Sequence, residues 1–395
     1  MTGKSAHTRS RGVALVAAAA FALALAAPAH ALELSAPRVV ASGVPIPLAG
    51  TGALPSERVR IEVRRKGRWR PLAATRADAA GRFQRTVRPA SIRSRYALRA
   101  TDSAGAVSKR ANVRARPVLL AAVGDVNLGN GPGALIDAYG PRYPWTATAP
   151  TLRAADVAFG NLECAVSTRG APVPKLYNFR GRPAALRAMA RYAGFDVLNL
   201  ANNHTGDYGT QALLDTVKHV RRFGMKAVGA GGSLASAAEP RVVTRLGLKI
   251  AFVGFSNILP AAFYAGPDKA GTQPATPELI AAGVKRAKRR AHVVIATFHW
   301  GVERATTEDA RQRSFAAVAL ANGADAVIGA HPHVLQPIER RGRHRLVAYS
   351  LGNFVFGASS AVTARTGILR MALSARGVEG HRLVPAAIRA TRPAL

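Results

Sequence analysis

Two histidines separated by one residue, in the run Gly329-Ala330-His331-Pro332-His333, have the type and spacing needed to bind a metal ion. They follow the apolar run 326–328, which predicts a buried strand. Residues two apart in an extended segment point to the same side, and Pro332 favours extended backbone at the residue before it. The pattern therefore predicts that His331 and His333 face one ion, although on its own it also fits a loop with two unrelated histidines.

Five apolar runs of the sequence end in polar groups that can bind metal ions. Because ligands bind at the carboxyl ends of the strands in α/β sheets, we expect these groups to converge on one sheet edge. Oxygen and imidazole donors without a thiolate favour one or two Zn, Mn or Fe ions. Each residue alone also fits a structural role, such as a helix cap or a core histidine. The groups, each with the run that it follows, are Asp125 (118–123), Glu163 (157–159), Asn203 (197–200), His299 (293–298) and the pair His331 and His333 (326–328).

The elements that must position these residues begin after Arg116-Pro117. From there strand-like and helix-like runs alternate, which predicts an α/β domain over 117–395. The expected strands are 118–123, 157–159, 197–200, 250–255, 293–298, 326–328 and 346–349. The expected helices are 183–192, 209–223, 277–289 and 308–322.

The preceding segment, 32–116, reads as a series of short strands. Val59, Ile61 and Val63 alternate with charged residues, and turn signals such as Asp78-Ala79-Ala80-Gly81 separate the runs. The segment resembles bacterial immunoglobulin-like modules, which implies a small β-sandwich. It contains no histidine. A spacer or wall-binding role is therefore expected rather than catalysis.

The first 31 residues have the pattern of a signal peptide. Basic residues precede an apolar stretch over 13–27, and Ala29-His30-Ala31 follows as a cleavage site. We therefore expect a secreted or cell-envelope, extracytoplasmic protein, with the peptide either cleaved or kept as an anchor. Cys164 is the only cysteine, so no disulfide can form within one chain.

The charge of the chain indicates anionic partners. Its 395 residues include 56 Lys and Arg against 21 Asp and Glu, a formal net charge of +35. This balance suits wall polymers, lipid head groups or polyglutamate, although a scattered solvated surface would give the same composition. No basic run is interleaved with aromatic residues, so nucleic-acid binding is not favoured.

Six segments in order along the chain resemble the CapA family. This family is named for capsular poly-γ-glutamate synthesis and belongs to the calcineurin-like metallophosphoesterase superfamily. The resemblance implies a metallophosphoesterase-like four-layer α-β-β-α sandwich with metal-bearing loops at one end. The segments are 124–128 (GDVNL), 160–163 (GNLE), 199–204 (NLANNH) with Asp207 and Gly209, 299–301 (HWG) with Glu303, 329–333 (GAHPH) with Gln336, and 350–354 (SLGNF).

The resemblance also implies a role for each matched residue. Asn127 stands where the superfamily motif has a histidine, and Glu163 stands where it has a bridging aspartate. The implied general acid is His204, which would protonate a leaving oxygen. The implied metal ligands are Asp125, Glu163, Asn203, His299, His331 and His333. Residues implied to support these ligands or to contact substrate are Asn127, Asn161, Asn202, Asp207, Glu303 and Asn353.

Two functions follow as hypotheses. The first is a metal-dependent hydrolase that acts on an anionic ester or an amide-linked polymer in capsule or poly-γ-glutamate metabolism. Lys175, Arg180 or Arg182 would then neutralise the anionic polymer or phosphorylated substrate. The alternative is a non-catalytic, polymer-binding component of capsule synthesis or export that contacts the cell wall or a membrane surface. Fold alone does not choose between them.

Overall fold

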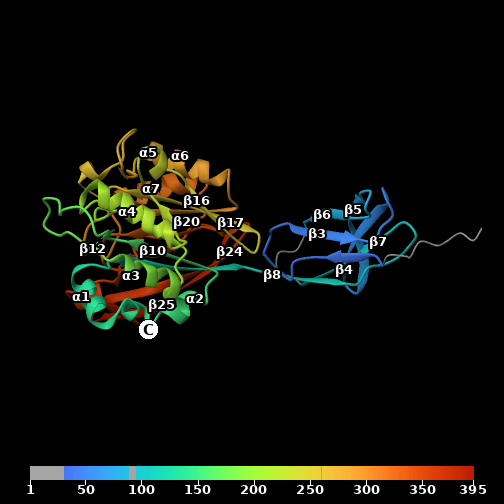
Figure 1. Ribbon diagram of the computed structural model, residues 1–395, viewed down its shortest axis with the longest axis horizontal. Helices are drawn as coiled ribbons and strands as arrows, with labels where there is room; N and C mark the ends of the chain where they lie inside the picture. The colour runs from blue at the N-terminus through green and yellow to red at the C-terminus, as the bar shows by residue number, and fades with distance from the viewer. Residues whose placement is uncertain (1–30, 89–94, 259) are drawn as a thin grey trace, which may run out of the picture.

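The computed structural model describes residues 31–88, 95–258 and 260–395. The predicted signal peptide therefore lies outside the described residues, apart from Ala31. The chain forms a smaller lobe of β-strands followed by a larger lobe of strands and helices (Figure 1). Within the described residues, no helix is both long and apolar enough to cross a membrane.

The smaller lobe consists of two sheets that pack over one apolar core. Val59 and Ile61 of one sheet and Ile46 and Phe83 of the other are buried in the same cluster. This packing agrees with the predicted β-sandwich, whereas membership of the immunoglobulin-like class stays a prediction. The three-stranded sheet has the order β1 (Glu33–Ser35), β3 (Ile46–Thr51), β6 (Phe83–Val87). The five-stranded sheet has the order β2 (Val39–Ala41), β8 (Ala111–Arg116), β7 (Arg95–Thr101), β4 (Arg58–Arg65), β5 (Arg68–Arg76).

An eight-stranded mixed sheet forms the first half of the larger lobe. β14, β13, β10 and β9 are parallel neighbours, and the last three strands in the order are antiparallel. β23 also pairs with β9. The order is β14 (Lys226–Val228), β13 (Val197–Asn199), β10 (Val157–Leu162), β9 (Val118–Val126), β24 (Arg365–Ser374), β25 (Gly377–Arg389), β26 (Arg392–Ala394), with β23 (Asn353–Val355) beside this path.

A six-stranded mixed sheet forms the second half. Its four central strands are parallel, and an antiparallel strand closes each edge. The order is β16 (Arg241–Arg245), β17 (Leu248–Ser256), β19 (Val293–His299), β20 (Ala326–Ala330), β22 (Leu346–Ala348), β21 (Ile338–Arg340). Two short ladders lie outside both sheets: β11 (Ala165–Val166) with β12 (Arg180–Gly181), and β15 (Ala230–Gly231) with β18 (Gly271–Thr272).

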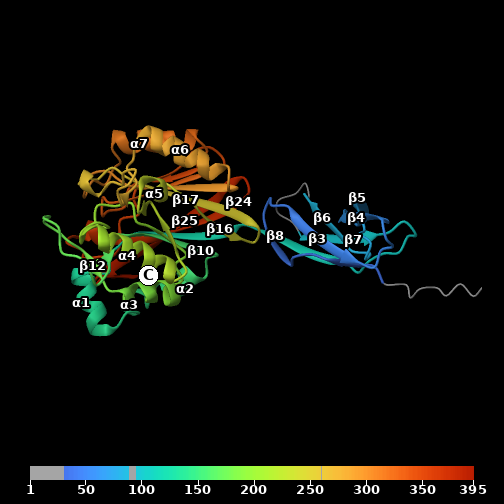
Figure 2. The ribbon, with the colours of Figure 1, turned by 45° about the horizontal axis from the view of Figure 1, so that its top comes forward.

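Helices cover the outer faces of these two sheets, as Figure 2 shows. On the side of the eight-stranded sheet lie α1 (Asn130–Tyr139), α2 (Ala149–Arg153), α3 (Pro183–Ala188), the π-helical turn η2 (Met189–Ala193) and α4 (Gly209–Arg222). On the side of the six-stranded sheet lie α6 (Pro277–Lys288) and α7 (Ala310–Ala321). The remaining short helical turns are η1 (Tyr143–Trp145), α5 (Leu234–Ala237), η3 (Ala261–Phe263) and α8 (Ala361–Ala364).

The resulting layers are helix, sheet, sheet, helix, as the CapA resemblance implied. Phe159 of β10 stacks on Phe252 of β17, with ring centroids 5.7 Å apart, in the core between the sheets. Local signals set the helix starts: Thr276 caps α6 by accepting from the N–H of Leu279, and Asp309 forms a capping box with Gln312 at α7.

All seven expected strands and all four expected helices of this lobe are present, with ends shifted by a few residues. One expectation is wrong: the candidate metal-binding groups do not lie at the edge of a single sheet. Asp125 and Glu163 come from the eight-stranded sheet, and His299 comes from the six-stranded sheet. Alternating strand and helix signals do not reveal that the strands divide into two sheets, because the local pattern is the same in both cases.

Close backbone contact holds the end of β9 in place. The N–H of Asp125 donates to the carbonyl of Gly352 at 2.9 Å. A Cβ on Gly124 would lie 1.8 Å from the same carbonyl oxygen. Because both partners are backbone atoms, neither can move without breaking the β9 ladder.

The first prediction concerns this contact. Gly124→Ala should lower the free energy of unfolding by about 3 kcal/mol, because a Cβ here meets backbone rather than a flexible side chain. Urea unfolding followed by circular dichroism would measure it. Gly380→Ala is the matched control: Gly380 also lies within a strand, β25, but its Cβ would have nothing within 4 Å. Equal stability of the two variants would contradict the proposed contact.

Candidate metal centre

Loops from both sheets meet at this site. The eight-stranded sheet supplies Asp125 in β9, Glu163 directly after β10, and Asn203 in the turn after β13. The six-stranded sheet supplies His299, the last residue of β19, and the loop after β20 that carries His331 and His333. The structure thus brings together all six residues expected to bind metal.

Glu163 lies at the centre of the group. Its Oε1 is 3.4 Å from Nε2 of His299, 3.8 Å from Nε2 of His333 and 3.9 Å from Nε2 of His204. The side chain is fully buried, and neither carboxylate oxygen has a hydrogen-bond partner. A buried carboxylate normally has its oxygens satisfied, so this one lacks a donor or a cation.

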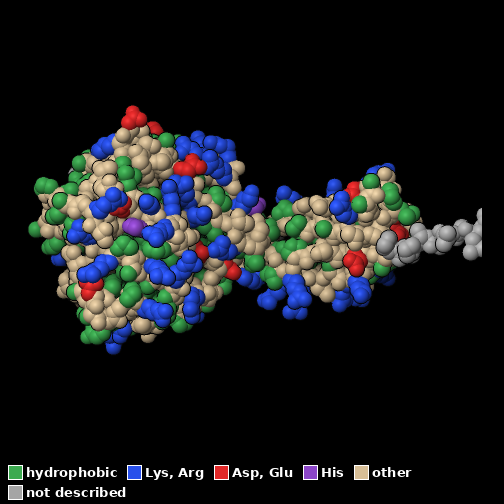
Figure 3. Space-filling view, viewed as in Figure 1, with side chains coloured by type: hydrophobic (Ala, Val, Ile, Leu, Met, Phe, Trp, Pro, Cys, Tyr) green, Lys and Arg blue, Asp and Glu red, His purple; other side chains and the backbone are tan. Residues whose placement is uncertain are grey.

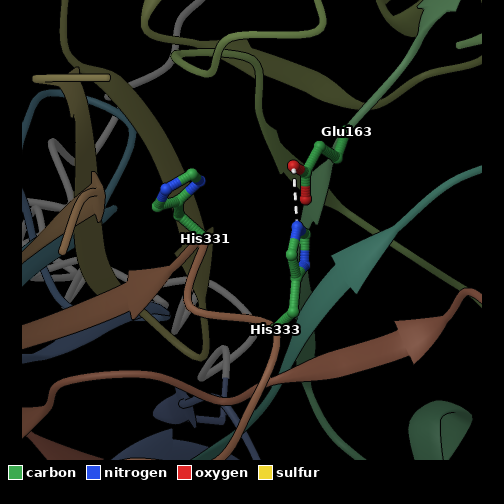
Figure 4. A group of neighbouring side chains, drawn as sticks. All are labelled: Glu163, His331 and His333. Carbon is green, nitrogen blue, oxygen red and sulfur yellow. Dashed lines mark ion pairs between the residues drawn. The ribbon is translucent and has the colours of Figure 1, made fainter. Parts of the chain in front are cut away.

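His333 connects the two carboxylates. Its Nδ1 lies 3.1 Å from Oδ2 of Asp125, and its Nε2 faces Glu163. Figure 4 shows this imidazole pointing at the Glu163 carboxylate, with the His331 ring to one side. His331 instead approaches Nε2 of His299 with its Nδ1, at 3.2 Å.

The backbone of this loop differs from the expected extended segment. His331 has φ of 100° and His333 has φ of 60°, both in the region that side chains other than glycine seldom adopt. Expecting the two rings to share one side of a strand was therefore wrong. They approach the carboxylates because the loop turns sharply around Pro332, with the His331 N–H directed at Oδ2 of Asp125 at 3.3 Å.

Asn161 and Asn203 hold the His299 ring from opposite sides. The Asn161 side-chain N–H₂ donates to Oδ1 of Asp125 at 2.8 Å and lies 3.2 Å from Nδ1 of His299. Nδ1 must accept, so in this arrangement Nε2 carries the proton and donates to Oδ1 of Asn203 at 2.8 Å. Asn161 thus contacts two of the candidate ligands and fixes the direction in which His299 faces the site.

His204 belongs to a buried dyad. Its Nδ1 donates to Oδ2 of Asp207 at 2.6 Å, which turns Nε2 towards Glu163. Lys175 donates to the other oxygen of Asp207 at 2.6 Å and to the backbone carbonyl of Asn203 at 2.5 Å. The Phe179 ring stacks on the imidazole, with centroids 4.1 Å apart. The ring is therefore fixed in tautomer and orientation, and Lys175 serves the dyad rather than an open substrate site.

The pKa values of the two carboxyl groups are shifted in opposite directions. Burial raises the pKa of Glu163 well above its ordinary value, and the neighbouring charge of Asp125 raises it further. Burial alone would also raise the pKa of Asp125, but its contacts with His333 and its hydrogen bond from Asn161 lower that pKa instead. Two adjacent buried carboxylates cannot both be ionised at low cost, so a proton or a cation must offset one of the two charges.

Burial also keeps most of the imidazoles neutral. It lowers the pKa of His299 well below the ordinary value and that of His331 to about 3. The pKa of His204 is lowered by burial in spite of Asp207. For His333, burial favours the neutral ring, but the contact with Asp125 wins and raises the pKa. Neutral imidazoles are the form that binds metal ions.

These observations fit one or two divalent cations. Two groups of donor atoms lie within 4.8 Å of one another: Glu163 with His331 and His333, and Asp125 with Glu163 and His299. Glu163 belongs to both groups, so it can bridge two ions. Oxygen and neutral imidazole donors suit Zn, Mn or Fe, and a cation would satisfy the two carboxylate oxygens that lack partners.

The other expected residues take supporting positions. Asn202 donates to the Leu162 carbonyl and accepts from the N–H of His204, so it links two site loops. Asn127 accepts from the N–H of Gly129 at 2.8 Å and holds its own turn. Asn353 lies against His333, whose pKa it helps to raise. Glu303 is exposed, yet close enough for its charge to raise the pKa of Glu163.

Sequence reasoning missed two side chains of the site. Phe179 lies in the stretch before β12, where no period or motif marked it. Asn199 donates from its side chain to Oδ1 of Asn161 at 2.9 Å, and its place at the start of the matched segment 199–204 was the available signal. Arg180 and Arg182, expected near substrate, line a neighbouring cavity of about 580 Å³ together with Gly129 and Ser167.

Comparison with known proteins identifies the family. Residues 119–358 match the family model described as bacterial capsule synthesis protein PGA_cap. The chain belongs to this family. The match covers the six-stranded sheet, the strands β9, β10, β13, β14 and β23 of the eight-stranded sheet and every residue of the candidate metal centre, but none of the strands β1–β8 or β24–β26.

Relatives in two bacilli extend the match. The chain is 31% identical over 275 residues to the PGA biosynthesis protein CapA of Bacillus subtilis (strain 168), covering 69% of this chain and 72% of the relative. It is 28% identical over 301 residues to the capsule biosynthesis protein CapA of Bacillus anthracis, covering 74% and 72%. The resemblance to the CapA family is therefore confirmed.

Solved structures resemble the chain more distantly. The 5'-nucleotidase precursor from Thermus thermophilus is 14% identical and aligns over 70% of this chain and 56% of its own, with a TM-score of 0.40. The NAD nucleotidase of Haemophilus influenzae is 14% identical and aligns over 69% and 50%, with a TM-score of 0.42.

The second prediction tests metal binding directly. The purified protein should carry close to stoichiometric transition metal after incubation with Zn²⁺ or Mn²⁺ and desalting, as measured by plasma mass spectrometry. The double variant His331→Ala/His333→Ala should lose it, because it removes one of the two donor groups and the ring that joins Asp125 to Glu163. His381→Ala, which changes an exposed histidine of β25, is the control. Metal retained by the double variant would refute the assignment.

The third prediction concerns stability. Glu163→Gln should raise the melting temperature of the metal-free protein, because it removes a buried carboxylate that repels Asp125. Added metal at ~100 times its dissociation constant should stabilise the wild type by about 2.7 kcal/mol and the variant far less. Differential scanning calorimetry with and without metal would detect this reversal. A metal-free variant that melts below the wild type would show that Glu163 is satisfied without a cation.

Proposed function

We propose that this chain is an exported, metal-dependent hydrolase of capsule or poly-γ-glutamate metabolism, with a metallophosphoesterase-like site. Its substrate would be an anionic ester or an amide-linked anionic polymer. The observation that carries the proposal is the buried Glu163 carboxylate, which has no donor and is approached by three imidazoles. Family membership supports the link to capsule synthesis, since relatives are named for that process.

The expected metal ligands fit a divalent ion, which would activate a water molecule and stabilise negative charge in the transition state. His204 would act as the proton donor in its protonated form, in which Nε2 carries a proton as well as Nδ1. Its Nδ1 is held by Asp207 at 2.6 Å, so Nε2 is free to face a leaving oxygen or nitrogen. Asp207 also stabilises the protonated ring, as the orienting carboxylate of a catalytic dyad does.

Two arginines that line a separate cavity, outside the candidate metal centre, would neutralise an anionic substrate. Arg180 and Arg182 are exposed and line the cavity beside the loop that carries Phe179. Arg180 lies over the Tyr208 ring at 4.2 Å, and Arg182 pairs with Asp137 at 2.9 Å. Guanidinium groups in these positions suit carboxylate or phosphate groups of an incoming chain.

Export and the role of the smaller lobe belong to the same proposal. The signal-peptide pattern of residues 1–31 supports a location outside the cytoplasm, in the cell envelope or the medium. We infer that the two-sheet lobe is an immunoglobulin-like spacer that carries the catalytic lobe at the cell surface.

The fourth prediction separates a hydrolase from a polymer-binding protein. With saturating metal, the wild type should hydrolyse a member of a panel that contains phosphomonoesters, phosphodiesters and poly-γ-glutamate. His204→Ala should lower kcat on that substrate by about 10²–10⁴-fold, because it removes the proton donor. Metal content, measured on the same samples, should not change.

Two controls make the result decisive. Asp207→Asn should lower kcat in the same direction, since it removes the carboxylate that holds His204, whereas His381→Ala should retain full activity. No turnover of any panel member by the metal-loaded wild type, together with binding of poly-γ-glutamate, would reject hydrolysis and favour the non-catalytic alternative.

A further inference from the structure

One face of the smaller lobe carries an unusual concentration of arginine. In the five-stranded sheet, alternate residues of β4 such as Val59, Ile61 and Val63 point into the core, so their neighbours point outward. The outward face, here called the arginine face, carries Arg58, Arg60 and Arg64 on β4, Arg76 on β5, Arg95 and Arg99 on β7, and Arg114 on β8. Lys and Arg side chains are prominent along the border of this lobe in Figure 3.

The strand register places like charges directly opposite one another. Arg58 pairs with Arg76 across β4 and β5, and Arg95 pairs with Arg114 across β7 and β8. Like charges at directly opposed positions destabilise a sheet. A surface needed only for solubility could place these arginines diagonally or beside acids. The register therefore indicates a face arranged to receive an anion.

Ion pairing differs between the two lobes. In the larger lobe many arginines have acidic partners, including Arg245 with Asp196 at 2.6 Å and Arg182 with Asp137 at 2.9 Å. On the arginine face, Glu62 pairs with Arg99 at 2.6 Å. Within the described part of the chain, the other arginines of this face form no ion pair: Arg58, Arg60, Arg64, Arg76, Arg95 and Arg114.

The basic surface continues around the end of the β4–β5 hairpin. Arg65 and Arg68 are opposed there, and they line a depression of about 620 Å³ with Lys66, Arg70 and Pro71. At the centre of the face Arg99 lies over the Trp69 ring at 4.4 Å, so the ring is covered by a cation. By register Arg65, Arg68 and Arg70 lie on the side of Val63, opposite the arginine face, so the depression is a second cationic surface at the end of the hairpin.

We propose that the arginine face binds an extended polycarboxylate chain. The ligand is the anionic polymer itself, and this identification rests on the proposed function. The argument that the face binds an anion rests on its charge alone. The backbones of neighbouring strands lie about 4.8 Å apart, and alternate residues along a strand lie about 6.8 Å apart, so the arginine side chains start from a grid with this spacing. A flexible chain with a carboxylate on every residue can match this grid with many paired contacts.

Two other classes of partner fit less well. Binding to a lipid surface draws on apolar side chains that enter the bilayer, but no large exposed hydrophobic side chain lies on the described residues of β4, β5, β7 or β8. Binding to single-stranded nucleic acid draws on open aromatic rings, and Trp69 is covered by Arg99. The face therefore offers charge and hydrogen-bond donors without either feature.

The test measures equilibrium binding of the full mature protein to poly-γ-glutamate of defined length. The variant Arg58→Gln/Arg60→Gln/Arg76→Gln/Arg114→Gln should bind about tenfold more weakly or worse, and its affinity should depend less steeply on salt, because fewer counterions are released. The control Arg153→Gln/Arg222→Gln/Arg311→Gln/Arg382→Gln removes equal charge from exposed positions of the larger lobe. It should bind within about twofold of the wild type.

Thermal unfolding of the same proteins shows whether the variants fold. The arginine-face variant should melt at or above the wild-type temperature, since it removes two pairs of opposed like charges. Equal loss of affinity in both variants, or wild-type affinity in the arginine-face variant, would overturn the proposal. Binding of the same proteins to phosphatidylglycerol vesicles and to single-stranded DNA is measured in parallel. If the arginine-face variant loses affinity for one of these two probes but not for poly-γ-glutamate, the proposal is also overturned.

A failure here is distinguishable from a failure of the proposed function. Binding is measured without added metal, so that neither turnover nor a bound metal ion contributes to it. If the wild type hydrolyses polymer while the arginine-face variant binds it unchanged, the proposed function stands and the arginine face is not its docking surface. If the arginine face binds poly-γ-glutamate but no substrate is turned over, the docking surface stands and the proposed hydrolase function fails.

Discussion

Two carboxylates buried side by side are the constraint on which the larger lobe depends. Asp125 and Glu163 lie at neighbouring strand ends where the two sheets meet, and neither is exposed to water. Folding can place them there only if protons, imidazoles or cations offset the repulsion. The surrounding asparagines, the strained loop at His331 and the contact of Gly124 with Gly352 all hold groups around this pair. The lobe is therefore built to hold a charged centre that it stabilises incompletely by itself.

Facing two sheets against each other makes this centre possible. Each sheet has parallel central strands that end at the same side of the lobe, so carboxylates from one meet imidazoles from the other. The core between them is apolar, with Phe159 stacked on Phe252, and it keeps the two sets of strand ends in fixed relation. The dyad of His204 and Asp207 arises from the turn after β13 and depends on Lys175 from another loop. The candidate metal ligands and the dyad thus come from separate segments that only the tertiary structure brings together.

The sequence predicted the types of the elements, and which side chains gather at the site, better than it predicted how those side chains are arranged. Strand ends followed by Asp125, Glu163, Asn203 and His299 are a local signal, and all four residues meet in the structure. The division of the strands into two sheets has no local signal in the sequence, so its prediction came from the family resemblance alone. The backbone at His331 was predicted as extended because Pro332 favours that form, but tertiary contacts with Asp125 impose a positive φ instead. Phe179 could not be found, because stacking on His204 depends on how a nonperiodic loop folds back.

The junction between the lobes has a mechanical consequence. Pro117 alone separates β8 from β9, and Arg116 holds Asp156 through two contacts, at 2.6 and 2.7 Å. The next strand, β9, carries Asp125. The five-stranded sheet is therefore joined to the metal centre by a strand and a single linking residue. A polymer bound both at the arginine face and at the metal centre would span a constant distance between them. Such an arrangement would distinguish polymers by the length of the chain rather than by the order of its units.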